Sequence, residues 1–279
     1  MTATDWTKWL GRQAVSSDTF TQNMLSRIAA TLNTPTPPDG TALPLLWHWC
    51  FFQQTVGTDE LAVDGHPVPG DFLPPAHGRQ RMWAGGRLEF IRPFIAGKTA
   101  GRCSTIKAVE EKHGRNGSLL FVTVLHEYSQ DGELVVQEEQ DIVYREPSPP
   151  KLSSQLAPAA ADWREEVDAS EQLLFRYSAI TFNTHRIHYD WPYATEQEGY
   201  PGLVVHGPLM ATLLVKSFVE ANPMASVLAF SFRGVRPLIA GEVMEVGGVI
   251  QESGVASLWS ATGAGIGQEG TIRFSHQVK

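Results

Sequence analysis

Cysteines and basic residues are scarce in this sequence, and each scarcity excludes a class of protein. Only two cysteines, Cys50 and Cys103, occur in 279 residues, which is too few for a disulfide framework and lacks the paired spacing of a zinc site. Lys and Arg number 22 against 30 Asp and Glu, so the formal net charge is −8. Because binding a phosphate backbone requires a basic surface, we expect no nucleic-acid partner.

Long apolar runs and metal-binding motifs are also missing. No segment approaches the roughly 20 apolar residues that span a membrane, and the first residues have neither the basic region nor the apolar core of a signal peptide. No HExxH or clustered-carboxylate loop indicates a metal. We therefore expect a cytoplasmic protein with no membrane contact, no metal and no cofactor.

The predicted elements fall into two similar halves. Alternating or apolar segments predict four strands in the first half and four in the second, at residues 86–94, 100–107, 119–128, 134–144, 227–235, 242–251, 256–262 and 267–277. A helix is predicted from about Phe20, with Ser16–Asp18 as its N-cap. The bulky segment Leu45–Phe52 should be buried, and Asp131-Gly132 predicts a hairpin turn.

One motif occurs twice and suggests how the halves arose. Ile91–Gly97 reads IRPFIAG, and Val235–Gly241 reads VRPLIAG; both copies follow an aromatic-rich strand and precede three more strands. We interpret this as duplication of one α+β unit. The predicted units are residues 1–146 and 163–279, joined by a Pro- and Ala-rich linker at 147–162.

Polar side chains gather in the second half only. Within eight positions the chain places Asn183, His185, Arg186, His188 and Asp190. A short apolar segment then ends at Gly207, and Pro208 opens an apolar helix. Free N–H groups at such a helix start can stabilise a carbonyl oxygen that gains negative charge. His188 is the natural acid/base, because an unperturbed imidazole titrates close to operating pH.

These residues resemble the motif of the MaoC-like, or hydratase-2, hotdog family. The matching segments, in the family's order, are Tyr177-Ser178-Ala179, Ile187-His188, Asp190 and Val205-His206-Gly207. The chain departs from the motif at Asn183, where the family has its catalytic aspartate, and at His185-Arg186, where it has Asn-Pro. This variant is most similar to the branch that contains hydroxyacyl-thioester dehydratase type 2 and the mesaconyl-C4-CoA (itaconyl-CoA) hydratases.

The resemblance implies an α+β double hotdog, in which each of two tandem units wraps an antiparallel sheet around a central helix. It implies a hydratase that adds water reversibly to a small branched dicarboxylic enoyl-CoA, such as mesaconyl-C4-CoA or itaconyl-CoA, to give citramalyl-CoA. CoA is then part of the substrate, and a homodimer is expected. The first half, which has no polar cluster, would be a wall of the acyl pocket or scaffold.

The predicted catalytic residues are His188 as acid/base, Asn183 as a holder of water, and Gly207 as the oxyanion donor. On a strand, Asp190 would share a face with His188 and orient its imidazole, whereas within a helical turn it would not. A second proton carrier could be either His185 or Asp190. The residues leave these alternatives open.

The predicted substrate-binding residues also have alternatives. Arg186 either binds a substrate carboxylate or forms an ion pair with Glu196, Glu198 or Asp190. Arg233 and Arg236 either meet the CoA phosphates or lie on a solvated edge, and Arg92, the counterpart of Arg236, is expected to be structural. The remaining members of the predicted binding set are Tyr177, His185 and His206.

Three other functions compete with the small-substrate hydratase. A 3-hydroxyacyl-thioester dehydratase of fatty-acid synthesis would need a tunnel for a long acyl chain, whereas in the first half that space could be filled by Trp47, Trp49, Phe51 and Phe52. A non-catalytic acyl-binding protein would explain the loss of the family's base at Asn183. A thioesterase is the third alternative, since hotdog folds host both activities.

Overall fold

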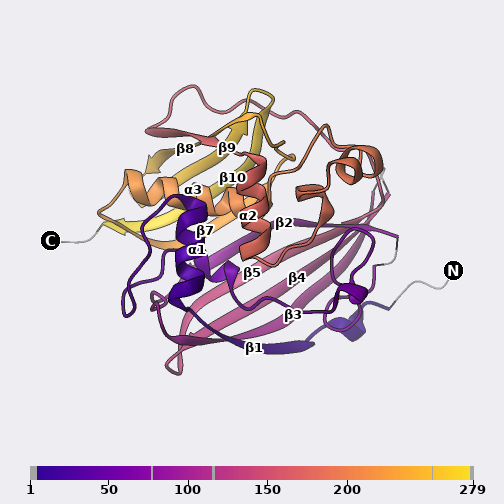
Figure 1. Ribbon diagram of the computed structural model, residues 1–279, viewed down its shortest axis with the longest axis horizontal. Coiled ribbons are helices and arrows are strands. Elements are labelled where there is room, and N and C mark those ends of the chain that lie inside the picture. Colours follow the sequence, from indigo (N-terminus) through magenta and orange to yellow (C-terminus); the bar gives the residue numbers. More distant parts are fainter. Residues whose placement is uncertain (1–4, 77, 115–116, 253, 277–279) are drawn as a thin grey trace.

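In the part of the chain that the structure describes, ten antiparallel strands form one sheet and three α-helices lie on one face of it (Figure 1). The computed structural model describes residues 5–76, 78–114, 117–252 and 254–276. The strand order across the sheet is β1-β3-β4-β5-β2-β7-β10-β9-β8-β6. The helices are α1 (Gln22–Leu32), α2 (Glu171–Ile180) and α3 (Gly207–Ala221). In the first half the strands are β1 (Gln13–Thr19), β2 (Gln80–Phe90), β3 (Thr99–Gly114), β4 (Gly117–Gln130) and β5 (Glu133–Arg145). In the second half they are β6 (Trp163–Asp168), β7 (Ala225–Gly234), β8 (Val243–Glu252), β9 (Val255–Thr262) and β10 (Gly265–His276).

The strand order has the symmetry of a duplication. Reading outward from the middle of the sheet, β2-β5-β4-β3-β1 on one side corresponds to β7-β10-β9-β8-β6 on the other. The halves meet where β2 pairs with β7, with Leu88 opposite Phe230. Each copy of the repeated motif begins directly after one of these two central strands. Residues 147–162, all of them described, contain no helix or strand.

All eight predicted strands correspond to observed ones, although Gln277, at the end of the last, lies outside the described residues. The Asp131-Gly132 hairpin is confirmed, because both residues have positive φ as a two-residue turn requires. The edge strands β1 and β6 were not expected, since they are short and mostly exposed. Ser16–Asp18 therefore lie in β1 rather than at a helix N-cap, and α1 begins at Gln22.

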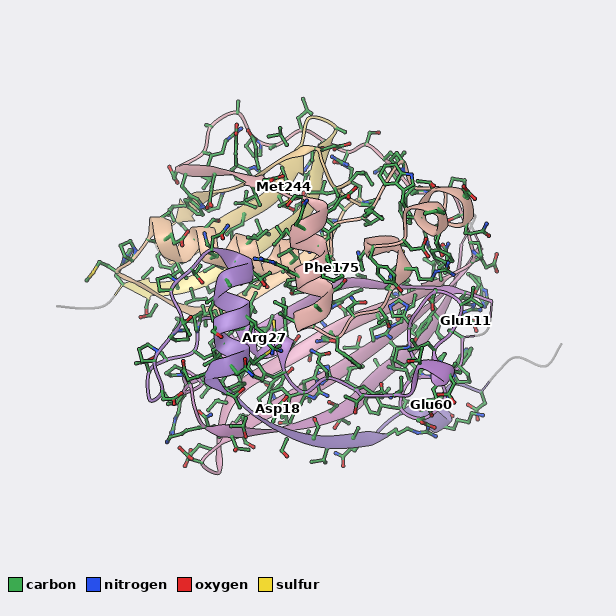
Figure 2. All side chains as sticks on the ribbon, viewed as in Figure 1. Asp18, Arg27, Glu60, Glu111, Phe175 and Met244 are labelled. Carbon is green, nitrogen blue, oxygen red and sulfur yellow. The ribbon has the colours of Figure 1, made fainter. Side chains whose placement is uncertain are left out.

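The central helix is fully formed in the second half only. There α3 runs for 15 residues with Pro208 in its first turn, and it packs on the strands that include buried Met244 of β8 (Figure 2). In the first half the corresponding segment is the four-residue 3₁₀ helix Trp47–Cys50. Leu46 before it and Phe52 after it have positive φ, which interrupts a helix. The aromatic segment is nevertheless buried, as predicted.

A buried carboxylate holds that aromatic segment to the sheet. Glu138 of β5 is fully buried and accepts hydrogen bonds from the Trp49 indole at 2.9 Å and the Tyr128 hydroxyl at 3.0 Å. His48 Nε2 lies 3.3 Å from the same carboxylate. Burial alone raises the pKa of Glu138, but the hydrogen bond and charge of His48 outweigh it and lower the pKa to about 2. The first half therefore contains a structural polar network.

Candidate active site

His188 is buried at the end of a 3₁₀ turn, Arg186–His188, and its imidazole is held in one orientation. Its Nδ1 lies 2.7 Å from the carbonyl oxygen of Val204. Because a carbonyl only accepts, Nδ1 carries the proton and Nε2 has a free lone pair. Burial lowers the pKa of His188 to about 4. His188 is therefore neutral at pH 7 and can act as a base through Nε2.

His206 stacks against His188 at the start of α3. The ring centroids are 3.7 Å apart and the planes differ by 20°. His206 Nε2 shares a hydrogen bond of 2.8 Å with the hydroxyl of Ser178, and the Tyr177 ring lies 5.1 Å away. Burial lowers the pKa of His206 well below its ordinary value. The family-like residues Tyr177, Ser178, His188 and His206 are thus brought together as the sequence predicts.

Gly207 provides open space beside this stack. A Cβ built on Gly207 would meet no atom within 4 Å. No acceptor for the Gly207 N–H exists among the described residues, while its own carbonyl accepts from Gln268 Nε2 at 3.1 Å. The N–H lies at the positive end of the α3 dipole. A ligand carbonyl can therefore reach it.

Asp190 does not orient His188. Its carboxylate accepts hydrogen bonds from Arg186 Nε at 2.9 Å and from the Tyr193 N–H at 3.1 Å. The chain forms a turn here rather than a strand, so the two side chains do not share a face. Val204 orients the imidazole in place of Asp190.

Arg186 adopts the ion-pair alternative. Besides Asp190, its guanidinium donates to the Val63 carbonyl at 3.0 Å and covers the Tyr193 ring at 4.1 Å. Asn183 is also engaged, because its Oδ1 accepts the His185 N–H at 2.9 Å. That bond occupies the oxygen that was expected to hold water, and it leaves the Asn183 NH₂ group to donate.

The two predicted phosphate-binding arginines lie elsewhere. Arg236 is buried and donates to Thr262 Oγ1 at 2.5 Å and to the Gly265 carbonyl at 2.8 Å, so it ties down the β9–β10 turn rather than a solvent-exposed phosphate. Arg233 is exposed and paired with Glu269 at 2.6 Å. Arg236 is therefore neither on a solvated edge nor free to meet a phosphate in this arrangement, whereas Arg233 matches the solvated-edge alternative.

A hairpin from the first half reaches this site and was missed by sequence reasoning. Leu61 and Pro67 bridge its two arms, and the Asp64 carbonyl accepts the Arg186 N–H at 2.9 Å. The Gly65 carbonyl accepts the Thr184 hydroxyl at 2.5 Å. A side chain at Gly65 would collide with the Thr184 carbonyl. The polar Asp-Gly-His turn is the only local signal that could have drawn attention to it.

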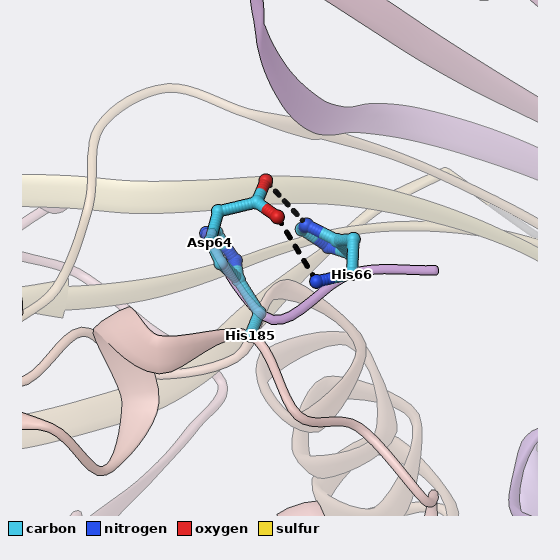
Figure 3. A group of neighbouring side chains, drawn as sticks. All are labelled: Asp64, His66 and His185. Carbon is cyan, nitrogen blue, oxygen red and sulfur yellow. Dashed lines mark hydrogen bonds and ion pairs between the residues drawn. The ribbon is translucent and has the colours of Figure 1, made fainter. Parts of the chain in front are cut away.

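The hairpin completes a row of four imidazoles. His66 and His185 have ring centroids 4.1 Å apart, and His185 and His188 5.4 Å apart, followed by the stack on His206. Figure 3 shows both carboxylate oxygens of Asp64 turned toward His66, with His185 close by. The pKa of His185 is lowered, and burial is the largest cause. Three neighbouring groups lower it further: His66, His188 and Arg81. Burial thus keeps these imidazoles mainly in their neutral form, while the Asp64 carboxylate beside His66 acts in the opposite direction.

Arg81 of β2 lies within electrostatic reach of this row. Its charge lowers the pKa of His66 and of His185 and lowers that of Asp64. Within the described part of the chain, the Arg81 side chain makes no hydrogen bond and no ion pair within 4 Å. Its guanidinium can therefore still hydrogen-bond to an anionic ligand group, although the Asp64 carboxylate offsets part of its charge.

Comparisons with known proteins show the family to which the chain belongs. The family of hydroxyacyl-thioester dehydratase type 2 matches residues 46–240. The mesaconyl-C(4)-CoA hydratase of Chloroflexus aurantiacus is 43% identical over 85% of this chain and 86% of its own length. The mitochondrial hydroxyacyl-thioester dehydratase type 2 of Schizosaccharomyces pombe is 26% identical over 90% of this chain and 93% of its own.

Solved structures show the same fold at lower identity. A MaoC-like dehydratase from Phytophthora capsici superposes with a TM-score of 0.74 and 15% identity, covering 99% of this chain and 100% of that one. The fold is thus a MaoC-like double hotdog, and the protein is a hydro-lyase of the hydratase-2 type. The chain belongs to the hydroxyacyl-thioester dehydratase type 2 family. No helix in the described part of the chain is long and apolar enough to cross a membrane.

Proposed function

We propose that the protein adds water reversibly to a small branched dicarboxylic enoyl-CoA, mesaconyl-C4-CoA or itaconyl-CoA, to form citramalyl-CoA. The observation that carries this substrate class is Arg81, whose side chain makes no hydrogen bond or ion pair within the described residues and acts electrostatically on His66 and His185. A guanidinium free to make new hydrogen bonds can pair with the second carboxylate of a dicarboxylic acyl group. The 43% identical relative bears the name of such a hydratase.

The proposed reaction uses the groups around His188. His188 Nε2 takes a proton from water as the water oxygen bonds to the β-carbon. The electrons of the double bond move onto the thioester oxygen, which accepts the Gly207 N–H. The imidazolium of His188 then returns the proton to the α-carbon, so atoms and charge balance. Asn183 contributes its NH₂ group to the water or to a substrate oxygen.

The substrate carboxylate is assigned to Arg81 because Arg186 already pairs with Asp190. In mesaconyl-C4-CoA the free carboxylate is on the β-carbon, the carbon that water attacks. The cation that binds this carboxylate should therefore lie on the side of His188 from which water attacks. On that side the row of imidazoles continues through His185 to His66, and both are within electrostatic reach of Arg81.

We further propose that residues 163–279 carry the catalytic groups and that residues 1–146 form wall and scaffold, joined by 147–162. The Asp64–His66 hairpin gives the first unit a direct part in the site. A cytoplasmic location and a homodimer remain predictions.

Mass spectrometry of enoyl-CoAs incubated with the protein tests the function. We expect mesaconyl-C4-CoA to gain one water much faster than crotonyl-CoA or a long-chain enoyl-CoA. A preference for long monocarboxylic chains would favour the fatty-acid dehydratase. Release of free CoA, detected with a thiol reagent, would indicate a thioesterase, and ligand binding without any water addition would indicate a binding protein.

A further inference from the structure

We propose that Asp64 and His66, on the hairpin from the first half, form a catalytic pair that holds and polarises the attacking water opposite His188. This inference rests on the hydratase function proposed above. It identifies the group that takes the place of the family aspartate missing at Asn183. Proton transfer stays with His188, and His66 Nε2 accepts the hydrogen of water that is not transferred.

The pair has the geometry of an oriented imidazole. His66 Nδ1 lies 2.9 Å from Asp64 Oδ2, and the His66 backbone N–H donates to Asp64 Oδ1 at 3.0 Å (Figure 3). Both carboxylate oxygens thus face one histidine. The carboxylate places the proton on Nδ1 and leaves the Nε2 lone pair to accept, as in an Asp–His dyad. Among the described residues, none hydrogen-bonds to that Nε2.

The hairpin is held rigidly against the catalytic segment through its backbone. Ala62 N–H donates to the His66 carbonyl at 2.8 Å, and the Gly65 N–H donates to the Ala62 carbonyl at 2.9 Å. Across the two halves, the Asp64 and Gly65 carbonyls accept from Arg186 and Thr184. If the hairpin served only the fold, an imidazole at position 66 would not be needed. The contacts that hold the hairpin against the catalytic segment are made by main-chain atoms and by the Thr184 hydroxyl.

His66 is also placed to act on the same reactant as His188. His185 lies between them, with centroid separations of 4.1 Å and 5.4 Å. Burial is the main cause of the lowered pKa of His188 and the nearby His66 lowers it further, whereas the Asp190 carboxylate pairs with Arg186. About a fifth of the His66 side chain, 21%, is exposed, so water can reach it. In the proposed arrangement, one hydrogen of the attacking water faces the Nε2 lone pair of His188 and the other faces that of His66.

The same side chains could suggest a cation site, since Asp64, His66 and His185 offer ligand atoms within 4.8 Å of one another. The charge of Arg81 beside them opposes a cation. Asp64 also already uses both oxygens on His66. These two features favour a pair that holds water over a cation site.

The test compares steady-state hydration of mesaconyl-C4-CoA by four variants of the full-length protein. His66→Ala should lower kcat by about 10²–10³-fold, within the range of a group that acts on a transferred or held proton, with KM changed less than about threefold. His66→Gln should recover at least about tenfold of that loss, because its amide oxygen also accepts a hydrogen bond. Asp64→Asn should lower kcat at least about tenfold by disturbing the tautomer.

Thr184→Val is the matched structural control. It removes the side-chain anchor to Gly65 but leaves the pair intact. If the hairpin acts only through folding, Thr184→Val and His66→Ala should show similar losses in activity and in melting temperature, and His66→Gln should give no rescue. Either that pattern, or a folded His66→Ala variant within about threefold of wild-type kcat, would overturn the proposal.

Two further outcomes separate the alternatives. Loss of wild-type activity on chelation, restored by Zn²⁺ and matched by bound metal in the purified protein, would replace the water-holding pair with a metal site. A wild-type protein that adds water to no enoyl-CoA would overturn the proposed function and this inference with it. An active wild type whose His66 variants are unaffected overturns the inference alone.

Discussion

The imidazole of His188 lies against that of His206, with ring centroids 3.7 Å apart, and donates its Nδ1 proton to the Val204 carbonyl. The stack and the hydrogen bond fix both the plane and the tautomer of the catalytic ring. The Nε2 lone pair is thereby the one part of His188 left to react. The pH behaviour of the enzyme should follow from this arrangement.

We expect activity to persist to lower pH than an ordinary histidine base allows. Because the pKa of His188 is lowered to about 4, the neutral base remains the main form down to that pH. The acidic half-point of the kcat/KM profile should then lie well below about pH 6.5, the usual pKa of a histidine. A half-point at 6.5 in a protein that stays folded would contradict this.

Stability should decline over the same acidic range. His66, His126, His185, His188 and His206 all have lowered pKa values, caused first by burial. The unfolded chain therefore binds more protons below about pH 6.5, and stability falls as the pH drops from there through the lowered values. Melting temperatures between pH 8 and 4 measure the slope, which His188→Gln should reduce. A rise in stability with acid would be inconsistent with buried neutral histidines.

Gly207→Val should abolish turnover without unfolding the protein. The space around a Cβ at this position is empty, so the side chain fits the protein but occupies the approach to the N–H. We expect at least about a 10²-fold loss of kcat/KM, comparable to removing an oxyanion donor, with circular dichroism and melting temperature nearly unchanged. Full activity in the folded variant would place the oxyanion site elsewhere.

Arg81 and Arg186 should differ when each is changed to Gln. Loss of a charge-assisted pair of about 1.5–3 kcal/mol predicts that Arg81→Gln lowers kcat/KM for mesaconyl-C4-CoA by roughly 10–100-fold. Crotonyl-CoA, which has no second carboxylate, should lose much less. Arg186→Gln breaks the contacts to Asp190 and Val63, so it should reduce both activities equally and lower the melting temperature. If instead Arg186→Gln selectively reduced activity on mesaconyl-C4-CoA and Arg81→Gln reduced both activities equally, the substrate carboxylate would be assigned to Arg186.

Glu138→Gln tests the buried network of the first half. Breaking a buried, hydrogen-bonded pair costs about 3–5 kcal/mol, so the free energy of unfolding measured with urea should fall by that order. Glu133→Gln is the control, because Glu133 is mostly exposed and its pair with Arg92 contributes little. Equal stability of the two variants would show that His48 and Glu138 are not coupled.

Much of the architecture follows from local pattern. Strand periodicity, the repeated Arg-Pro motif and Pro208 before an apolar run predicted eight strands, the duplication and α3, because each depends on neighbours in sequence. The Tyr177, His188 and His206 segments were similarly recognisable as a family motif. These residues come together because the motif itself spans one helix, one turn and the next helix start.

Only the tertiary structure decided the partners of the charged groups. Whether Asp190 faces His188 or Arg186 depends on the 3₁₀ turn at 186–188, a difference of one backbone conformation. Asp64 and His66 reach the site from more than a hundred residues away, where the Thr184 hydroxyl and Gly65 carbonyl meet. Contacts between such distant segments leave no periodicity in the sequence, because they are selected by packing of the whole sheet and its helices. The sequence therefore determined the scaffold and the central histidine, and the fold determined which side chains surround it.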